Sequence, residues 1–125
     1  MQSHARVVVI GGGVVGVSAL YHLAKKGWSD VVLLERKELT SGSTWHAAGL
    51  LPLFNMSYSV GQVHKYSVDF YQELQKETGQ DVGFAKVSNI RLAQTQDRMD
   101  EYRQYAGVAA TIGINVEFLT PKQVK

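Results

Sequence analysis

The 125-residue sequence has no cysteine, no long apolar run and no marked excess of one charge. Without cysteine the chain can form no disulfide framework, thiolate zinc site or cysteine nucleophile, so nothing indicates secretion. No stretch approaches the roughly 20 apolar residues of a membrane-spanning helix, and no signal-peptide core is visible at the start. The formal net charge of +2 is too small and too dispersed to favour nucleic acid or an anionic membrane as a partner.

The composition is that of an ordinary globular protein, with 45% hydrophobic residues and 12 glycines. The length allows one domain at most, and we expect a soluble protein with a packed core. None of the four histidines belongs to a set with metal-ligand spacing. We therefore expect no metal site.

The first 35 residues predict a βαβ unit, the core of a Rossmann-like α/β fold. Residues 6–10 form a β-branched run that is typical of a strand buried on both faces of a parallel sheet. Glycines 11–13 break this run, and residues 14–26 then follow the helical period up to Gly27. Residues 31–34 predict a second buried strand.

The rest of the chain predicts further elements from its period and its glycine stops. Residues 39–49 are rich in Ser, Thr, Gly and Ala, which indicates an irregular loop over the carboxyl edge of the sheet. The other predicted elements are helices at 59–78 and 97–112, paired short strands at 84–87 and 90–93, and a strand at 116–119.

The last residues predict the start of another helix. Thr120, Pro121 and Gln123 occupy the N-cap, first-turn and capping-box positions. We expect Lys125 to be a truncation point, because a natural domain rarely ends by starting an element that it does not build.

Gly11, Gly13 and Gly16 form a G-x-G-x-x-G pattern that follows a strand and opens a helix. This context is typical of a dinucleotide site, in which the helix N-terminus receives the pyrophosphate. Glu35 follows the last glycine by about 20 residues, where a carboxylate accepts hydrogen bonds from a ribose. The Glu35 carboxylate disfavours NADP and leaves both FAD and NAD as possible cofactors. The alternative to a dinucleotide site is a glycine-rich turn that only connects the strand and the helix of the βαβ unit.

The loop after the second predicted strand contains the residues that bear on the choice between FAD and NAD. Ser43 and Thr44 supply hydroxyl and backbone donors for phosphate or ribityl oxygens, and Trp45 and His46 stand out among small neighbours. Spacing alone leaves His46 as a solvated or hydrogen-bonding residue.

The fingerprint with Glu35, together with the run from Glu38 to Leu50 that contains Ser-Thr-Trp-His-Ala-Ala-Gly, resembles the dimethylglycine and sarcosine dehydrogenases. These flavoproteins belong to the D-amino-acid-oxidase-like superfamily. The resemblance continues to the end of the chain, through Glu77-Thr-Gly79, Val82-Gly-Phe84, Ile90-Arg-Leu-Ala93, Arg98 to Tyr102 and Leu119-Thr-Pro121.

The resemblance implies that residues 1–125 are the incomplete N-terminal part of an FAD-binding oxidoreductase domain, in which later strands would close the sheet and the substrate domain would begin as an insertion. It implies FAD as the cofactor and His46 as its covalent attachment point, through the flavin 8α-methyl carbon. A neutral imidazole nitrogen is a competent nucleophile for this bond. The residues implied to bind the cofactor are Gly11, Gly13, Val14, Val15, Gly16, Glu35, Arg36, Gly42, Ser43, Thr44, Trp45, His46, Ala47, Ala48, Gly49 and Leu50. No catalytic acid or base is assigned, because the family takes these groups mostly from later residues.

The implied activity is oxidation of the N-methyl amine of dimethylglycine or sarcosine by hydride transfer to the flavin. The acceptor would be an electron-transfer flavoprotein or oxygen, and tetrahydrofolate would bind through a C-terminal domain outside this chain. The alternatives are another amino-acid or amine oxidase of the superfamily and a non-catalytic paralogue like the regulatory subunit of pyruvate dehydrogenase phosphatase. We expect a bacterial cytoplasmic location, with the mitochondrial matrix as the alternative.

Overall fold

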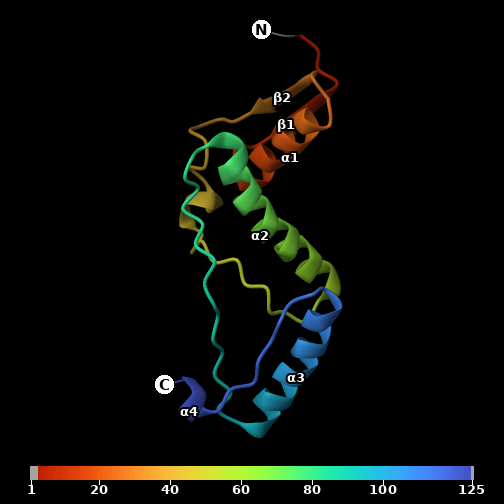
Figure 1. Cartoon of the computed structure of the whole chain (residues 1–125). Helices are drawn as coiled ribbons and strands as arrows, with labels where there is room; N and C mark the ends of the chain where they lie inside the picture. The colour runs from red at the N-terminus through yellow and green to blue at the C-terminus, as the bar shows by residue number, and fades with distance from the viewer. Residues whose placement is uncertain (1–2, 125) are drawn as a thin grey trace. The chain divides into compact units, whose positions relative to one another are not determined.

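The computed structural model describes residues 3–124 (Figure 1). These residues divide into two compact units, with the division between Leu50 and Leu51. Each unit has its own local architecture. They are described in turn.

The first unit is the predicted βαβ arrangement. Strand β1 (Val7–Ile10) leads into helix α1 (Val14–Lys25), and strand β2 (Val31–Leu34) returns parallel to β1. The register pairs Val7 with Val31 and continues residue by residue to the far end of both strands. Helix α1 packs against both strands and ends before Gly27, which has a positive φ of 83°. The boundaries agree with the sequence prediction to within one residue.

The prediction that these strands are buried on both faces is wrong for the described residues. Exposure alternates along β1: Val7 and Val9 are half-buried, whereas Val8 is 48% exposed and Ile10 is 85% exposed. In β2, Leu34 is 54% exposed. The sheet has two strands among the described residues, and α1 is the helix that packs on it. One face of the sheet therefore carries exposed apolar side chains at Val8, Ile10 and Leu34.

The second unit is built on helices α2 (Tyr58–Thr78) and α3 (Gln96–Thr111), which contact each other. Ser57 caps α2 by accepting the Val60 N–H at 3.3 Å, and Gly79 ends it in the left-handed conformation. The buried apolar residues of this unit are Val68, Ala109 and Ile112. Both helices were predicted, each with boundaries within one residue of the observed ones.

The three predicted strands at 84–87, 90–93 and 116–119 are wrong. Among residues 3–124 the only strands are β1 and β2, and the segments around 84–93 and 114–119 run without regular structure (Figure 1). Several of their apolar side chains are exposed to solvent: Val87 is 81% exposed and Leu92 is 73% exposed. A strand forms only where a neighbour satisfies its backbone groups, and no such neighbour is present in the described chain.

The predicted helix at the end of the chain is present as α4 (Pro121–Val124). Half of the predicted capping box is formed, because the Gln123 side chain accepts the Thr120 N–H at 2.8 Å. The Thr120 hydroxyl donates to the same Gln123 oxygen, and the Gln123 N–H bonds to the Thr120 carbonyl instead of the hydroxyl. Among the described residues no helix has both the length and the apolarity needed to cross a membrane.

Candidate cofactor-binding site

The glycine turn between β1 and α1 has the geometry that its sequence predicts. Gly11 has a φ of 105° and donates its N–H to the Leu34 carbonyl at 2.8 Å, which closes the turn over the end of β2. At Gly16, an added Cβ would lie 1.9 Å from the Gly11 carbonyl oxygen. Only glycine therefore lets α1 approach the turn this closely.

The N-terminus of α1 presents amide donors beside this turn. The Val14 N–H donates to the Thr44 hydroxyl at 2.9 Å. Within residues 3–124, the N–H groups of Val15 and Gly16 have no hydrogen-bond partner, as expected in the first turn of a helix. Together with the helix dipole, these donors favour an anion at this end of α1.

Glu35 follows β2 and faces the glycine turn. Its Oε2 accepts the Gly12 N–H at 2.7 Å, and its Oε1 accepts the Lys37 N–H at 2.8 Å. The Gly12 hydrogen bond first, then the Lys37 hydrogen bond and the charge of Arg36, hold the pKa of the Glu35 carboxyl below its usual value. The ordered carboxylate retains lone pairs that can accept hydroxyl protons from a ribose.

The loop after β2 folds back onto the glycine turn. Thr40 donates its N–H to the Gly12 carbonyl at 3.0 Å and adopts a φ of 66°, a conformation unusual for a β-branched residue. Trp45 in turn donates its N–H to the Thr40 carbonyl at 3.1 Å. Residues Ser43–His46 form a 3₁₀ helix, η1, so this part of the predicted irregular loop is regular.

His46 lies at the end of η1 with its side chain exposed to solvent. Its Nδ1 is 3.1 Å from the Gly42 carbonyl oxygen, which can only accept a hydrogen bond. In this arrangement Nδ1 carries the proton, and Nε2 carries a free lone pair. The second nitrogen is therefore the nucleophilic atom of this side chain.

The predicted site residues divide into two groups. Those from the turn, the end of β2 and η1 are brought together by the contacts above. Ala48, Gly49 and Leu50 extend away from η1 without a hydrogen bond among the described residues, and Leu50 is 77% exposed. Trp45 is also exposed, at 78%.

The sequence prediction missed two contributors to this geometry. Gly12 was not singled out, yet its N–H binds Glu35 and an added Cβ would lie 2.5 Å from Leu39 Cδ2. Its position between two assigned glycines was the available signal. Thr40 was also missed, and its backbone role has no signal in the sequence because threonine rarely adopts a positive φ.

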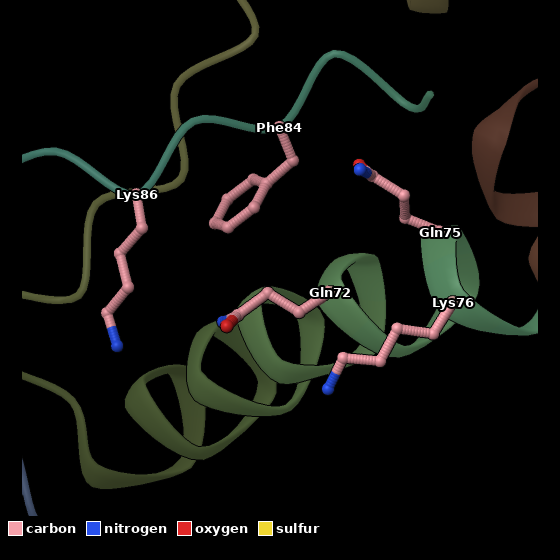
Figure 2. Close-up of a pocket in the computed structure, with 5 residues that line it drawn as sticks. All are labelled: Gln72, Gln75, Lys76, Phe84 and Lys86. Carbon is pink, nitrogen blue, oxygen red and sulfur yellow. The ribbon is translucent and has the colours of Figure 1, made fainter. Parts of the chain in front are cut away.

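An open groove in the second unit contains none of the predicted site residues. It is about 290 Å³ in volume and is lined by Gln72, Gln75 and Lys76 of α2 with Phe84 and Lys86 of the following segment (Figure 2). The Phe84 ring stacks on Tyr71, with ring centroids 6.2 Å apart. In the described part of the chain, no three His, Asp or Glu side chains are grouped to hold a metal ion.

Comparison with known proteins identifies relatives of the whole chain. Rat dimethylglycine dehydrogenase, described as mitochondrial, is 53% identical over 102 residues, which are 82% of this chain and 12% of that protein. The mouse regulatory subunit of pyruvate dehydrogenase phosphatase is 40% identical over 124 residues, covering 99% of this chain and 14% of its own length. Human sarcosine dehydrogenase is 40% identical over 126 residues, again covering 14% of its own length.

A solved structure shows the same fold. The crystal structure of L-proline dehydrogenase from P. horikoshii matches 99% of this chain and 32% of its own with a TM-score of 0.89, at 24% sequence identity. The chain thus spans about an eighth of the curated relatives and a third of this structure. The family model described as "FAD dependent oxidoreductase" matches residues 6–125, and the chain belongs to that family.

Proposed function

We propose that this chain is the N-terminal part of an FAD-dependent enzyme that oxidises the N-methyl amine of dimethylglycine or sarcosine. One observation carries the proposal: a dinucleotide-type glycine turn with Glu35 is joined by hydrogen bonds to the loop that contains His46. The similarity to dimethylglycine dehydrogenase over 82% of the chain supports the choice of substrate class.

The residues present fit the ADP half of FAD. The first-turn amides of Val15 and Gly16, with the dipole of α1, suit a pyrophosphate, and Gly13 presents no side chain toward it. The ionised carboxylate of Glu35 suits the hydroxyls of the adenosine ribose. When bound, FAD supplies a hydride acceptor for the amine and passes the electrons to an electron-transfer flavoprotein or to oxygen.

His46 is proposed as the covalent attachment residue. The Gly42 carbonyl fixes the tautomer in which Nε2 has the free lone pair, so this atom would form the bond to the 8α-methyl carbon. The exposure of the ring leaves room for a ligand at Nε2. The flanking residues Ser43, Trp45 and Ala47 to Leu50, with Arg36, are proposed to line the cofactor.

The remaining features of the proposal rest on the relatives. A tetrahydrofolate site would lie in a domain outside this chain. Several relatives carry the word mitochondrial in their names, which favours the mitochondrial matrix and gives no support to the expected bacterial cytoplasm. The exposed face of the two-stranded sheet is consistent with an incomplete domain, covered by later parts of a longer protein.

A second candidate function has its own observation. The pyruvate dehydrogenase phosphatase regulatory subunit matches 99% of the chain at 40% identity, so a regulatory role that does not depend on turnover is the alternative to an enzyme. A third candidate is another amine oxidase, since 4-methylaminobutanoate oxidase from Paenarthrobacter nicotinovorans is 38% identical over 125 residues.

Anaerobic reduction of the purified full-length flavoprotein distinguishes these functions. We expect dimethylglycine or sarcosine to bleach the flavin absorbance within the time of an enzyme turnover. Bleaching by 4-methylaminobutanoate alone would favour the other oxidase. Bound flavin that none of the three amines reduces would contradict the proposed activity and favour the regulatory role.

A further inference from the structure

The contact between Thr44 and Val14 joins two parts of the first unit that lie 30 residues apart. The Thr44 hydroxyl accepts the Val14 N–H at 2.9 Å, at the first residue of α1. The N-cap position of this helix is Gly13, which has no side chain to cap it. Thr44 therefore takes the place of a local capping residue, from a distant part of the chain.

Thr44 also lies in the same short helix as His46. Both residues belong to η1 and lie two positions apart, which is less than one helical turn. The position of one side chain therefore restrains the other. From residue 41 to residue 50, Thr44 is the only residue that is not exposed. Its hydroxyl is thus the side-chain attachment of an otherwise solvent-facing loop to the glycine turn.

A second link strengthens this attachment. The Thr40 N–H donates to the Gly12 carbonyl, and the Thr40 carbonyl accepts the Trp45 N–H. Thr40 keeps a left-handed backbone to make both contacts, which is a conformation that costs energy for threonine. The loop is therefore held at two points, Thr40 before η1 and Thr44 within it, against the turn that is proposed to bind the pyrophosphate.

We propose that Thr44 is the positioning residue for covalent flavin attachment, an inference that rests on the proposed role of His46. By capping α1, Thr44 fixes the position of His46 relative to the phosphates. A dinucleotide bound at the turn then has its flavin end at a fixed place relative to His46 Nε2. The Val14 N–H uses one lone pair of the Thr44 hydroxyl, and the proton of that hydroxyl remains available for a phosphate oxygen.

The attachment step balances with dioxygen as the oxidant. The bond between His46 Nε2 and the 8α-methyl carbon forms, while one methyl C–H bond and the Nδ1–H bond of His46 break. The two electrons and two protons released reduce the isoalloxazine, and dioxygen then takes them to give hydrogen peroxide. Thr44 takes no part in these bond changes, and its effect is on the distance and angle of approach.

The test uses full-length protein prepared without flavin and mixed with FAD in air. The measured quantity is the rate at which fluorescence becomes acid-precipitable, as a function of FAD concentration. We expect Thr44→Val to attach flavin at least about tenfold more slowly than wild type at saturating FAD, because misplacement of a reacting group lowers the rate. Thr44→Ser retains the hydroxyl and should remain within about twofold of wild type.

Ser41→Ala provides the matched control. Ser41 is an exposed neighbour whose hydroxyl makes no hydrogen bond within residues 3–124, so its variant should attach flavin at the wild-type rate. Circular dichroism checks the folding of each variant. If Thr44→Val does not fold, Thr44→Ala replaces it, with the same expected loss and the same rescue by serine.

Three different results would overturn the inference. If saturating FAD restores the wild-type rate to Thr44→Val, the hydroxyl acts only in cofactor binding and the positioning role is wrong. If wild-type protein leaves all its flavin in the acid supernatant, attachment at His46 itself is wrong, and the positioning role fails with it. Covalent flavin in wild type with an unchanged Thr44→Val rate contradicts the positioning role alone.

Discussion

Glu35 bonds directly to the glycine turn, and its carboxylate is ordered by two backbone amides. These hydrogen bonds lower the pKa of Glu35 from its usual value of 4.5 in the folded protein. Because this pKa is lowered, the ionised form of Glu35 stabilises the fold at pH values above its usual pKa. This contribution is lost as the pH falls through the lowered folded-state value.

Glu35→Gln should therefore reduce the melting temperature of the full-length protein at pH 7. We expect the difference between wild type and variant to narrow as the pH falls below 4.5, since the wild-type carboxyl then also becomes neutral. Thermal unfolding at a series of pH values measures this. An equal difference at pH 7 and at about pH 3 would contradict the assigned hydrogen bonds.

Gly16 is the glycine where the backbone approach is closest. A Cβ at this position would lie 1.9 Å from the Gly11 carbonyl oxygen, and the backbone cannot yield as a flexible side chain can. We expect Gly16→Ala to destabilise the protein by about 1–3 kcal/mol and to weaken FAD binding, because α1 must move away from the turn. Chemical denaturation and FAD titration measure the two effects.

Gly107→Ala is the control for this prediction. Gly107 lies inside α3, and an added Cβ there would meet no atom within 4 Å. Alanine in a helix interior is more favourable than glycine by about 0.5–1 kcal/mol, so this variant should gain stability. Equal losses of stability in Gly16→Ala and Gly107→Ala would show that the close backbone approach at Gly16 does not cause the destabilisation.

Among the elements, α2 shows how local sequence determines a helix boundary. Ser57 precedes the helix and accepts the Val60 N–H, while Gly79 ends it with a φ of 68°. Ser57→Ala should cost about 1 kcal/mol of stability by removing this cap. Ser59→Ala, which changes an exposed serine inside the first turn, should have a much smaller effect in the same denaturation experiment.

The helices could be predicted because their signals are local. Periodic apolar residues and glycine stops are read within one segment, and the boundaries of α1, α2 and α3 agree to within one residue. The strands predicted after α2 and α3 failed for the opposite reason. Val87, Ile90 and Leu92 have strand-like composition, but a strand also needs a partner, which a local pattern does not specify.

The candidate site also combines features that have a local sequence signal with features that depend on tertiary contacts. The glycine turn and Glu35 follow a spacing that has a physical cause, and the structure brings them together. The contact between Thr44 and Val14 spans 30 residues, so no local pattern contains it. The positive φ of Thr40 was unpredictable because local preference opposes it, and tertiary contacts alone hold it in place.

For the whole molecule, the central claim is a flavoprotein whose cofactor is fixed at His46. The chain belongs to the FAD dependent oxidoreductase family and covers about an eighth of its curated relatives. Its first unit holds the turn, the acid and the histidine, so flavin attachment is the property that we propose for this unit. Substrate selection is expected from residues outside it.

The most direct measurement is mass spectrometry of the proteolytic peptide that contains His46, taken from the full-length holoprotein. The account predicts a peptide heavier by one FAD less two hydrogen atoms, with the fragment ions placing the added mass on His46. The same peptide from His46→Ala should be unmodified. An unmodified wild-type peptide, or a flavin attached to a different residue, would contradict the account.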